Sequence, residues 1–273
     1  MDKLDPYVTK YNDSSYVFKS CSRDWIVVLR KLADTITNES RPVADTYCAK
    51  FRANKLQVVD IINKFDQSIT CDSICNSVYK DKQMVYKKGE IIEVEEFNTN
   101  VNEVCTTGIH YYKTMKVAFY LELEIVRDGE LISWRDNGGM LSKRTYKDGK
   151  REGEYISWYD NGQMKAKGIY KDGKPEGEWI SWYDNGQMKS KGIYKDGKQE
   201  GEWVYWYDNR QMESKGIYKD GYLKGEWIYW YDNGRMKTKG TYKDGKREGE
   251  WIFWCDNGKM ISKGKYKDGK EER

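Results

Sequence analysis

A tryptophan recurs every 24 residues in the second half of this chain. The six copies are Trp134, Trp158, Trp182, Trp206, Trp230 and Trp254. A Gly-Glu pair precedes each tryptophan and a Lys-Asp-Gly triplet follows it, without insertion between copies. A fixed period of this length indicates one small supersecondary unit stacked six times, in which each copy contacts its neighbours. Such an array is better suited to presenting a long surface than to enclosing a reaction.

Each repeat is predicted to form two short strands and two tight turns, as its third copy shows. Residues Glu178 to Tyr183 are rich in tryptophan, isoleucine and tyrosine, which fit a pleated strand. Asn185-Gly186 then predicts a two-residue type I′ hairpin turn. The second strand runs from Gln187 to Lys195, and Asp196-Gly197 turns the chain again. We therefore expect a mainly β fold, an elongated and twisted antiparallel meander of six two-stranded repeats.

The two-residue loop fixes which residues face each other across the hairpin. It places Trp182 opposite Lys189, and Trp179 opposite Gly192 with the indole ring covering the glycine. One face is then free of charge, and its members are Trp179, Ser181, Tyr183, Met188, Ser190, Gly192 and Tyr194. A three-residue loop with a bulge would mix charge into both faces, so the charge-free face favours the two-residue loop.

One column on the charge-free face gains aromatic rings toward the C-terminus. It runs Ser133, Ser157, Ser181, Tyr205, Tyr229 and Phe253. An aromatic strip flanked by small residues is typical of binding hot spots, so we predict that Tyr205, Tyr229 and Phe253 bind a partner protein. The alternative is that these rings fill a thin core.

The opposite face is predicted to carry a stripe of lysines. Its members are Lys165, Lys167, Lys189, Lys191, Lys237 and Lys239. Ammonium groups in a row attract the phosphates of anionic lipids. Glu154, Glu178 and Glu202 share this face and dilute its charge, so a solvated charged face is the competing interpretation.

The composition limits both the core and the class of partner. Only 38% of the residues are hydrophobic, but 23 tyrosines and 11 tryptophans can stabilise a thin sheet. The net charge is +4 and evenly spread, which argues against a dedicated nucleic-acid surface. No apolar run resembles a signal peptide or a membrane span, so we expect a cytoplasmic protein with reduced cysteines.

Residues 1–127 show no repeat and are predicted to form a compact α+β domain before the six repeats of 128–273. In the segment 49–65, Leu56, Val59 and Ile62 have helical spacing, which predicts a helix. The segment 83–95 is predicted to form a hairpin around Lys88-Gly89. Residues 118–126 have the composition of a strand and should pair with the first repeat.

The candidate catalytic and metal-binding residues are few. His110 is the only histidine, and with Cys105 it could form a nucleophile pair. A lone histidine beside isoleucine and tyrosine is more often structural. Cys71 and Cys75 have no second cysteine or histidine pair at metal spacing. We therefore predict no catalytic residues, no metal and no cofactor.

The repeat pattern G-E-W-I-x-W-Y-D-N-G-x-M-x-x-K-G-x-Y-K-D-G-K resembles the MORN repeat variant family over residues 129–270. That resemblance implies an elongated antiparallel sheet, and it is associated with scaffolding, protein contact and sometimes membrane lipid. The segments KSCSRDWIVVLRKL, AKFRANKLQVVDIINKF and CTTGIHYYKTMKVAFY resemble a domain of unknown function in giant DNA virus proteins of the mimivirus type. If the protein is viral, the expected location is the host cytoplasm.

Together these observations predict a non-enzymatic scaffold or adaptor that binds another protein through the aromatic face. The first alternative is peripheral association with anionic membrane through the lysines. The second is an enzyme activity in the N-terminal domain. An increase in ionic strength distinguishes binding of a protein through the aromatic face from binding of a membrane through the lysines, because binding of lipid by lysines weakens as ionic strength rises.

Overall fold

The computed structural model describes residues 4–76, 84–123 and 126–272. The chain divides into two compact units. The N-terminal unit contains Met1–Ile125 with Leu131–Leu141, and the repeat array contains Val126–Glu130 with Ser142–Arg273. The prediction of a mainly β fold with an antiparallel meander is confirmed.

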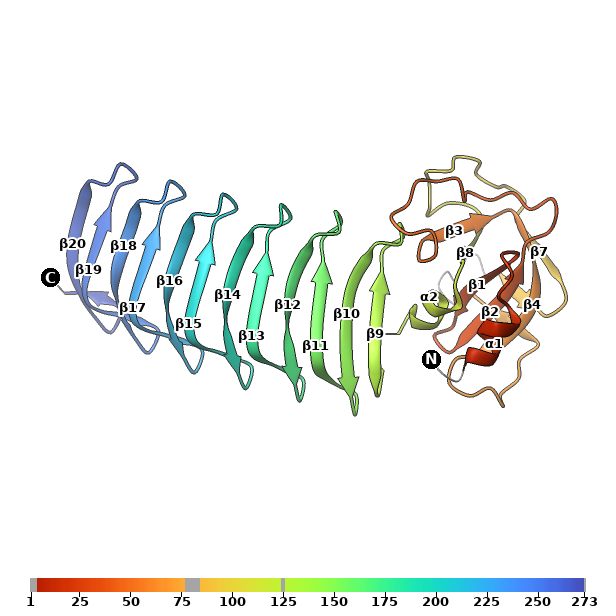
Figure 1. Ribbon diagram of the computed structural model, residues 1–273, viewed down its shortest axis with the longest axis horizontal. Coiled ribbons are helices and arrows are strands. Elements are labelled where there is room, and N and C mark those ends of the chain that lie inside the picture. Colours follow the sequence, from red (N-terminus) through yellow and green to blue (C-terminus); the bar gives the residue numbers. More distant parts are fainter. Residues whose placement is uncertain (1–3, 77–83, 124–125, 273) are drawn as a thin grey trace. The chain divides into compact units, whose positions relative to one another are not determined.

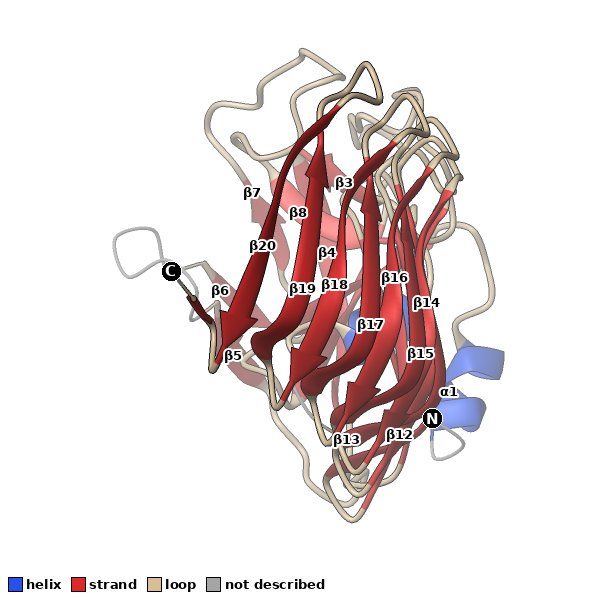
Figure 2. Ribbon diagram, turned by 90° about the vertical axis from the view of Figure 1, so that its left-hand side faces the viewer, coloured by secondary structure: helices blue, strands red, loops and turns tan. Residues whose placement is uncertain are grey.

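The repeats form one antiparallel sheet of 13 strands in strict chain order, from β9 to β21 (Figure 1). Its strands are β9 (Gly129–Trp134), β10 (Met140–Lys147), β11 (Lys150–Trp158), β12 (Met164–Lys171), β13 (Lys174–Trp182), β14 (Met188–Lys195), β15 (Lys198–Trp206), β16 (Met212–Lys219), β17 (Tyr222–Trp230), β18 (Met236–Lys243), β19 (Lys246–Trp254), β20 (Met260–Lys267) and β21 (Lys270–Glu271). Successive strands rotate steadily, as Figure 2 shows for β12 to β20.

The Asp-Gly turns are the two-residue type I′ turns of the array. Asp196 and Gly197 both have positive φ, at 51° and 82°, and Lys195 pairs with Lys198 directly across the turn. The aspartates at the five equivalent positions have φ between 49° and 53°. This part of the turn prediction is confirmed, and it explains why each repeat needs glycine after the aspartate.

The Asn-Gly turns differ from the prediction, because the loop has three residues and not two. The amide of Gly186 donates to the carbonyl of Tyr183 (3.0 Å), and the amide of Tyr183 donates to the carbonyl of Gln187 (2.8 Å). Only Gly186 has positive φ, whereas Asn185 does not. Such a loop combines a type I turn with a bulge at the glycine. Asn185 uses its Oδ1 to accept the amide of Gln187 (2.9 Å), which stabilises the loop.

A second bulge beside this loop restores the predicted pairing deeper in the hairpin. Trp182 pairs with Met188, so that Lys189 is the extra residue, while Ser181 pairs with Ser190. From there the pairing follows the prediction, with Trp179 opposite Gly192.

The predicted division into faces was therefore wrong near the loop. Met188 lies opposite Trp182 and not on the charge-free face. The ammonium group of Lys189 lies over the Tyr183 ring, 5.2 Å from its centroid. Lys189 thus contacts Tyr183, a residue that was predicted to lie on the charge-free face, so a charged group lies at the loop end of that predicted face.

The N-terminal unit is built on a six-stranded sheet with the order β3-β8-β1-β2-β4-β7, and β5 and β6 pair separately. Its elements are α1 (Asp5–Lys10), β1 (Tyr16–Cys21), β2 (Trp25–Arg30), β3 (Lys50–Ala53), β4 (Lys55–Asn63), β5 (Ser73–Cys75), β6 (Val85–Lys87), β7 (Ile91–Glu93), β8 (Ile109–Tyr112) and α2 (Met115–Tyr120). Alternate residues of β1 and β2 enter two separate apolar cores, one containing Val27 and Leu29 and the other Ile26 and Val28.

The helix predicted for residues 49–65 was wrong, since this segment forms β3 and β4. A bulge explains the misleading pattern. Leu29 pairs with Val58 and Val28 pairs with Asp60, which leaves Val59 as the extra residue. The bulge shifts the inward-facing positions by one residue, so a strand with period two imitates helical spacing.

Two other N-terminal predictions also need correction. β6 and β7 are strands, but they do not form the predicted hairpin, because β6 pairs with β5 and β7 with β4. Gln83, at the start of that prediction, lies outside the described residues. The strand predicted for 118–126 is wrong at its start, where α2 extends to Tyr120; residues 124–125 lie outside the described residues. Tyr120 contacts Trp134 through their rings, with centroids 6.0 Å apart.

Candidate interaction surface

One face of the array carries a continuous ladder of aromatic rings, which we call the ring face. Its two alternating columns are Tyr155, Trp179, Trp203, Trp227, Trp251 and Tyr170, Tyr194, Tyr218, Tyr242, Tyr266. Neighbouring rings meet edge to face, with centroids 4.9 to 6.4 Å apart. This geometry is the favoured one for aromatic pairs, so the ladder links the second repeat to the sixth through every repeat between them.

Each tryptophan of the ladder covers a glycine of the preceding repeat. A Cβ atom on Gly192 would overlap the indole of Trp203, and one on Gly216 would overlap that of Trp227. The prediction that the ring of Trp179 covers Gly192 was therefore wrong. The ring that covers Gly192 is that of Trp203, from the following repeat. The indole Nε1 of Trp203 donates to the carbonyl of Ile193 (3.1 Å), which fixes the ring in this position.

The predicted binding residues Tyr205, Tyr229 and Phe253 lie on the ring face and stack on the tryptophans two residues before them. The centroids of Trp203 and Tyr205 are 5.9 Å apart, with an interplanar angle of 25°. The other two pairs are arranged in the same way, at 5.8 and 6.3 Å. Trp203, for example, is only 3% exposed. A packing role for these half-buried rings is thus visible, and their binding role stays a prediction.

The hydroxyl of Tyr205 is tied into the same face. Gln199 Nε2 lies 2.9 Å from this hydroxyl oxygen, and the Tyr218 hydroxyl lies 3.5 Å away. Burial, followed by the contact with Tyr218, raises the pKa of Tyr205 well above its usual range. The ring is therefore held by its neighbours from three sides and kept neutral.

A second ladder, of hydrogen bonds, joins the Asn-Gly loops. The hydroxyl of Tyr183 donates to the carbonyl of Trp206 in the next repeat (2.8 Å), and Asn185 Nδ2 donates to the carbonyl of Asp208 (3.0 Å). The same tyrosine bond recurs at Tyr159, Tyr207 and Tyr231. In the sixth repeat Cys255 takes the tyrosine position.

The predicted lysine stripe separates into two groups. Lys167, Lys191 and Lys239 each form an ion pair with a glutamate of their own repeat, at 3.0, 2.6 and 2.8 Å. Lys165, Lys189 and Lys237 instead lie over the rings of Tyr159, Tyr183 and Tyr231, at 5.4, 5.2 and 5.5 Å. Because the first group is neutralised and the second lies at the loops, the six ammonium groups do not form one basic stripe.

In the N-terminal unit His110 and Cys105 make separate contacts. His110 Nε2 bonds to the carbonyl oxygen of Val104 (2.8 Å), and burial lowers the pKa of His110 to about 4. Cys105 Sγ lies 3.6 Å from a carboxylate oxygen of Asp136. Lys50 Nζ also donates to this thiol (3.8 Å), so a carboxylate and an ammonium group both contact Cys105. Cys71 Sγ donates to the carbonyl of Ser73 (3.0 Å), and Cys75 lies on β5.

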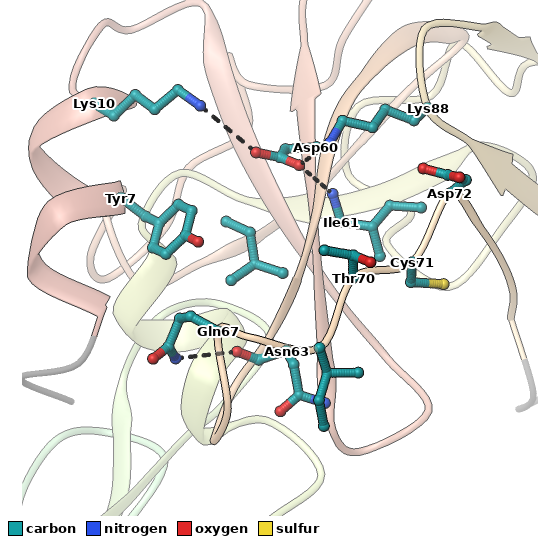
Figure 3. A pocket seen from close by; sticks show the side chains of 12 residues that line it. Tyr7, Lys10, Asp60, Ile61, Asn63, Gln67, Thr70, Cys71, Asp72 and Lys88 are labelled. Carbon is teal, nitrogen blue, oxygen red and sulfur yellow. Dashed lines mark hydrogen bonds and ion pairs between the residues drawn. The ribbon is translucent and has the colours of Figure 1, made fainter.

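A polar hollow of about 210 Å³ lies beside α1 and β4 (Figure 3). Lys88 lies 2.7 Å from the Asp60 carboxylate and Lys10 lies 3.7 Å from it. The hydroxyl of Tyr11 donates to the same carboxylate (2.7 Å). Burial raises the pKa of Asp60, but the bonds from Lys88 and Tyr11 outweigh this effect and lower it overall. The acid is thus already satisfied by its own neighbours.

Ser20 and Lys64 form a pair that the sequence analysis missed. Lys64 Nζ lies 2.8 Å from Ser20 Oγ and 2.9 Å from the carbonyl of Leu121. Burial lowers the pKa of Lys64 to about 8. The two residues are only 4% and 1% exposed, so no substrate reaches the hydroxyl in this conformation. No spacing in the sequence signals this pair, because β1 and the end of β4 are 44 residues apart.

Among the described residues, no helix has the length and apolar character needed to cross a membrane. Residues 151–172, 175–196, 223–244 and 247–268 match the MORN repeat variant. Residues 7–118 match a family of unknown function (DUF5758). The comparison with curated proteins gave no match.

Among solved structures, one described as "Crystal structure of GtfA/B complex bound to UDP and GlcNAc" aligns with 45% of this chain and 22% of that chain, at 12% identity and a TM-score of 0.15. The family matches are the informative ones. Four segments in the C-terminal half of this chain match the MORN repeat variant, and the part before them matches a family of unknown function.

Proposed function

We propose that this protein is a non-enzymatic scaffold or adaptor, and that its repeat array binds another protein through the ring face. The observation that carries the proposal is the ladder of edge-to-face rings running through the repeats along one side of a single sheet. Rigid aromatic side chains lose little conformational entropy on contact, and they are enriched at the centres of protein interfaces.

The match to the MORN repeat variant supports this class of function, because such repeats are generally modules that bind proteins or membranes. The charge distribution favours a protein over a membrane. A membrane-binding face needs free ammonium groups, but Lys167, Lys191 and Lys239 are paired with glutamates. We expect the protein to act in the cytoplasm, and an origin in a giant DNA virus stays a prediction.

The test is capture of partners by the full chain from cell extract, compared between the wild type and Tyr205→Ser with Tyr229→Ser. We expect the double variant to lose captured proteins if these rings bind. The matched control is Lys191→Gln with Lys215→Gln, which changes the opposite face. Flotation with vesicles containing 30% phosphatidylserine tests the membrane alternative, and salt-sensitive flotation of the wild type without protein capture would contradict the proposal.

A further inference from the structure

The repeats differ at one position of the ring face, and this difference marks a place for an incoming ring. In the last three repeats a ring lies beside the tryptophan on the same strand, as Tyr205 does beside Trp203. In the third repeat that position is Ser181, whose hydroxyl bonds to that of Ser190 (2.6 Å). The equivalent of the Tyr205 ring is therefore missing beside Trp179.

The indole of Trp179 is accordingly more open than its equivalents. Trp203, Trp227 and Trp251 are 3%, 1% and 0% exposed, whereas Trp179 stays partly exposed although Tyr155 stacks against it from the preceding repeat. An exposed indole held by its neighbours is a rigid platform for a partner ring, because its position is fixed before binding. The contact of Tyr205 with Trp203 shows which group this fold accepts there.

The charges beside this position are positive. Lys189 directly precedes Ser190, which lies opposite Ser181 across the hairpin, and Lys165 holds the equivalent place one repeat earlier. Both ammonium groups lie over tyrosine rings of the loops. In the fourth repeat the same place is occupied by Glu213. Lys237 holds this place in the fifth repeat, where Trp227 is buried beside Tyr229. The third repeat therefore combines a partly exposed indole with a lysine at this place.

We propose that Trp179 and Ser181, with Lys165 and Lys189, form a docking site for an extended acidic segment of a partner protein that carries tyrosine or phenylalanine. The partner ring stacks on Trp179 as Tyr205 stacks on Trp203, and its flanking carboxylates pair with the two lysines. The inference rests on the proposed scaffold function and specifies the partner that the ring face accepts.

The test uses the full chain, labelled with nitrogen-15, and acetylated, amidated peptides of sequence EEYEE, KKYKK and EEAEE. The indole N–H resonance of Trp179 is assigned from its loss in Trp179→Phe. We expect EEYEE to shift this resonance in a saturable way, and to bind at least tenfold more tightly than either other peptide. Equal shifts at every indole, or none at Trp179, would overturn the inference.

Two variants make the test specific. Ser181→Tyr supplies the missing ring from within the chain, so it should raise the melting temperature and weaken EEYEE binding at least tenfold. Tyr205→Ser opens the place beside Trp203 but leaves Glu213 next to it, so EEYEE should not shift the Trp203 indole. Adding Glu213→Lys to that variant should produce a second shifted indole. If Ser181→Tyr does not fold, Lys165→Glu with Lys189→Glu replaces it, and there the preference should change from EEYEE to KKYKK.

The outcomes separate this inference from the proposed function. Partner capture that persists in folded Ser181→Tyr, with Trp179 unmoved by EEYEE in the wild type, overturns the docking site and leaves the scaffold function in place. Loss of all partner capture by the wild type overturns the scaffold function itself. Vesicles of phosphatidylserine that shift Trp179 where EEYEE does not would assign the site to a membrane and overturn the inference.

Discussion

At the scale of single residues, the array depends on glycines that are covered by tryptophan rings. Gly168, Gly192, Gly216 and Gly240 all lie beneath an indole of the following repeat, and there is no room for a methyl group. In the first repeat the glycine position is Arg144, which pairs with Tyr155 instead of a tryptophan. The glycine position and the tryptophan position that covers it therefore change together, because the side chain of Arg144 and an indole ring cannot occupy the same place.

Replacing one of these glycines should test this dependence. Gly216→Ala forces the ring of Trp227 to move, so we expect it to lower the free energy of unfolding by about 2–3 kcal/mol. The control is Gly264→Ala in the last repeat, where the new methyl group meets the end of the flexible Glu271 side chain. That change should cost under about 1 kcal/mol. Urea denaturation followed by circular dichroism measures both, and equal losses would contradict the argument.

The buried histidine predicts a specific pH dependence of stability. Burial lowers the pKa of His110 to about 4 from its ordinary 6.5, so the unfolded chain binds the proton first as pH falls. The neutral form therefore stabilises the fold fully above pH 6.5, and this contribution, about 3 kcal/mol, is lost as pH falls to 4.

The matched variant is His110→Gln, whose amide can donate the same bond to Val104 but does not titrate. Because carboxylates such as Asp60 also titrate at low pH, the measured quantity is the difference in unfolding free energy between the two proteins. We expect that difference to change between pH 6.5 and 4. A difference that stays constant with pH would show that His110 is not buried in its neutral form.

At the scale of elements, one loop departs from the rest of the array. Arg210 replaces the loop glycine of the fourth repeat and keeps its left-handed conformation, with φ of 73° against 79° for Gly186. A residue with a Cβ atom pays about 1 kcal/mol for this conformation. Arg210→Gly should therefore raise the unfolding free energy by about that amount, and Gly186→Arg should lower it. A calorimetric melting temperature that falls in Arg210→Gly would contradict this explanation.

The elements also show what the sequence can predict. The Asp-Gly turns and the pairing of Trp179 with Gly192 follow from composition and alternation, and both are confirmed. The length of the loop at Asn185 could not be predicted in the same way. The bulge in this loop and the bulge at Lys189 have opposite effects on the register, so the strand pairing from Ser181 onward is the same as for a two-residue loop. At Val59 a single uncompensated bulge made a strand resemble a helix. Bulges leave no compositional signal, and they decide which face a side chain occupies.

At the scale of the whole molecule, the array should tolerate a change in the number of repeats. Deleting residues 183–206 joins Trp182 to Tyr207 and removes one full period, so every ladder is restored across the junction. Because each repeat contacts mainly its neighbours, the shortened chain should fold with a smaller urea m-value and a lower unfolding free energy. The control deletes residues 183–194, half a period, and should not fold.

Because its strands are regularly spaced, the ring ladder also offers contact sites at a fixed distance to any chain that binds along it. Equivalent side chains of successive repeats are two strands apart, roughly 9.5 Å at the usual strand spacing. A polyproline II helix advances about 9.3 Å in each three-residue turn. The two periods are nearly commensurate, whereas same-side residues of a β-strand recur at about 6.7 Å and fall out of step. A ligand in this conformation with one contact residue in every three would therefore place each contact residue at the same position of successive repeats. The length of the ligand would then determine how many repeats it contacts.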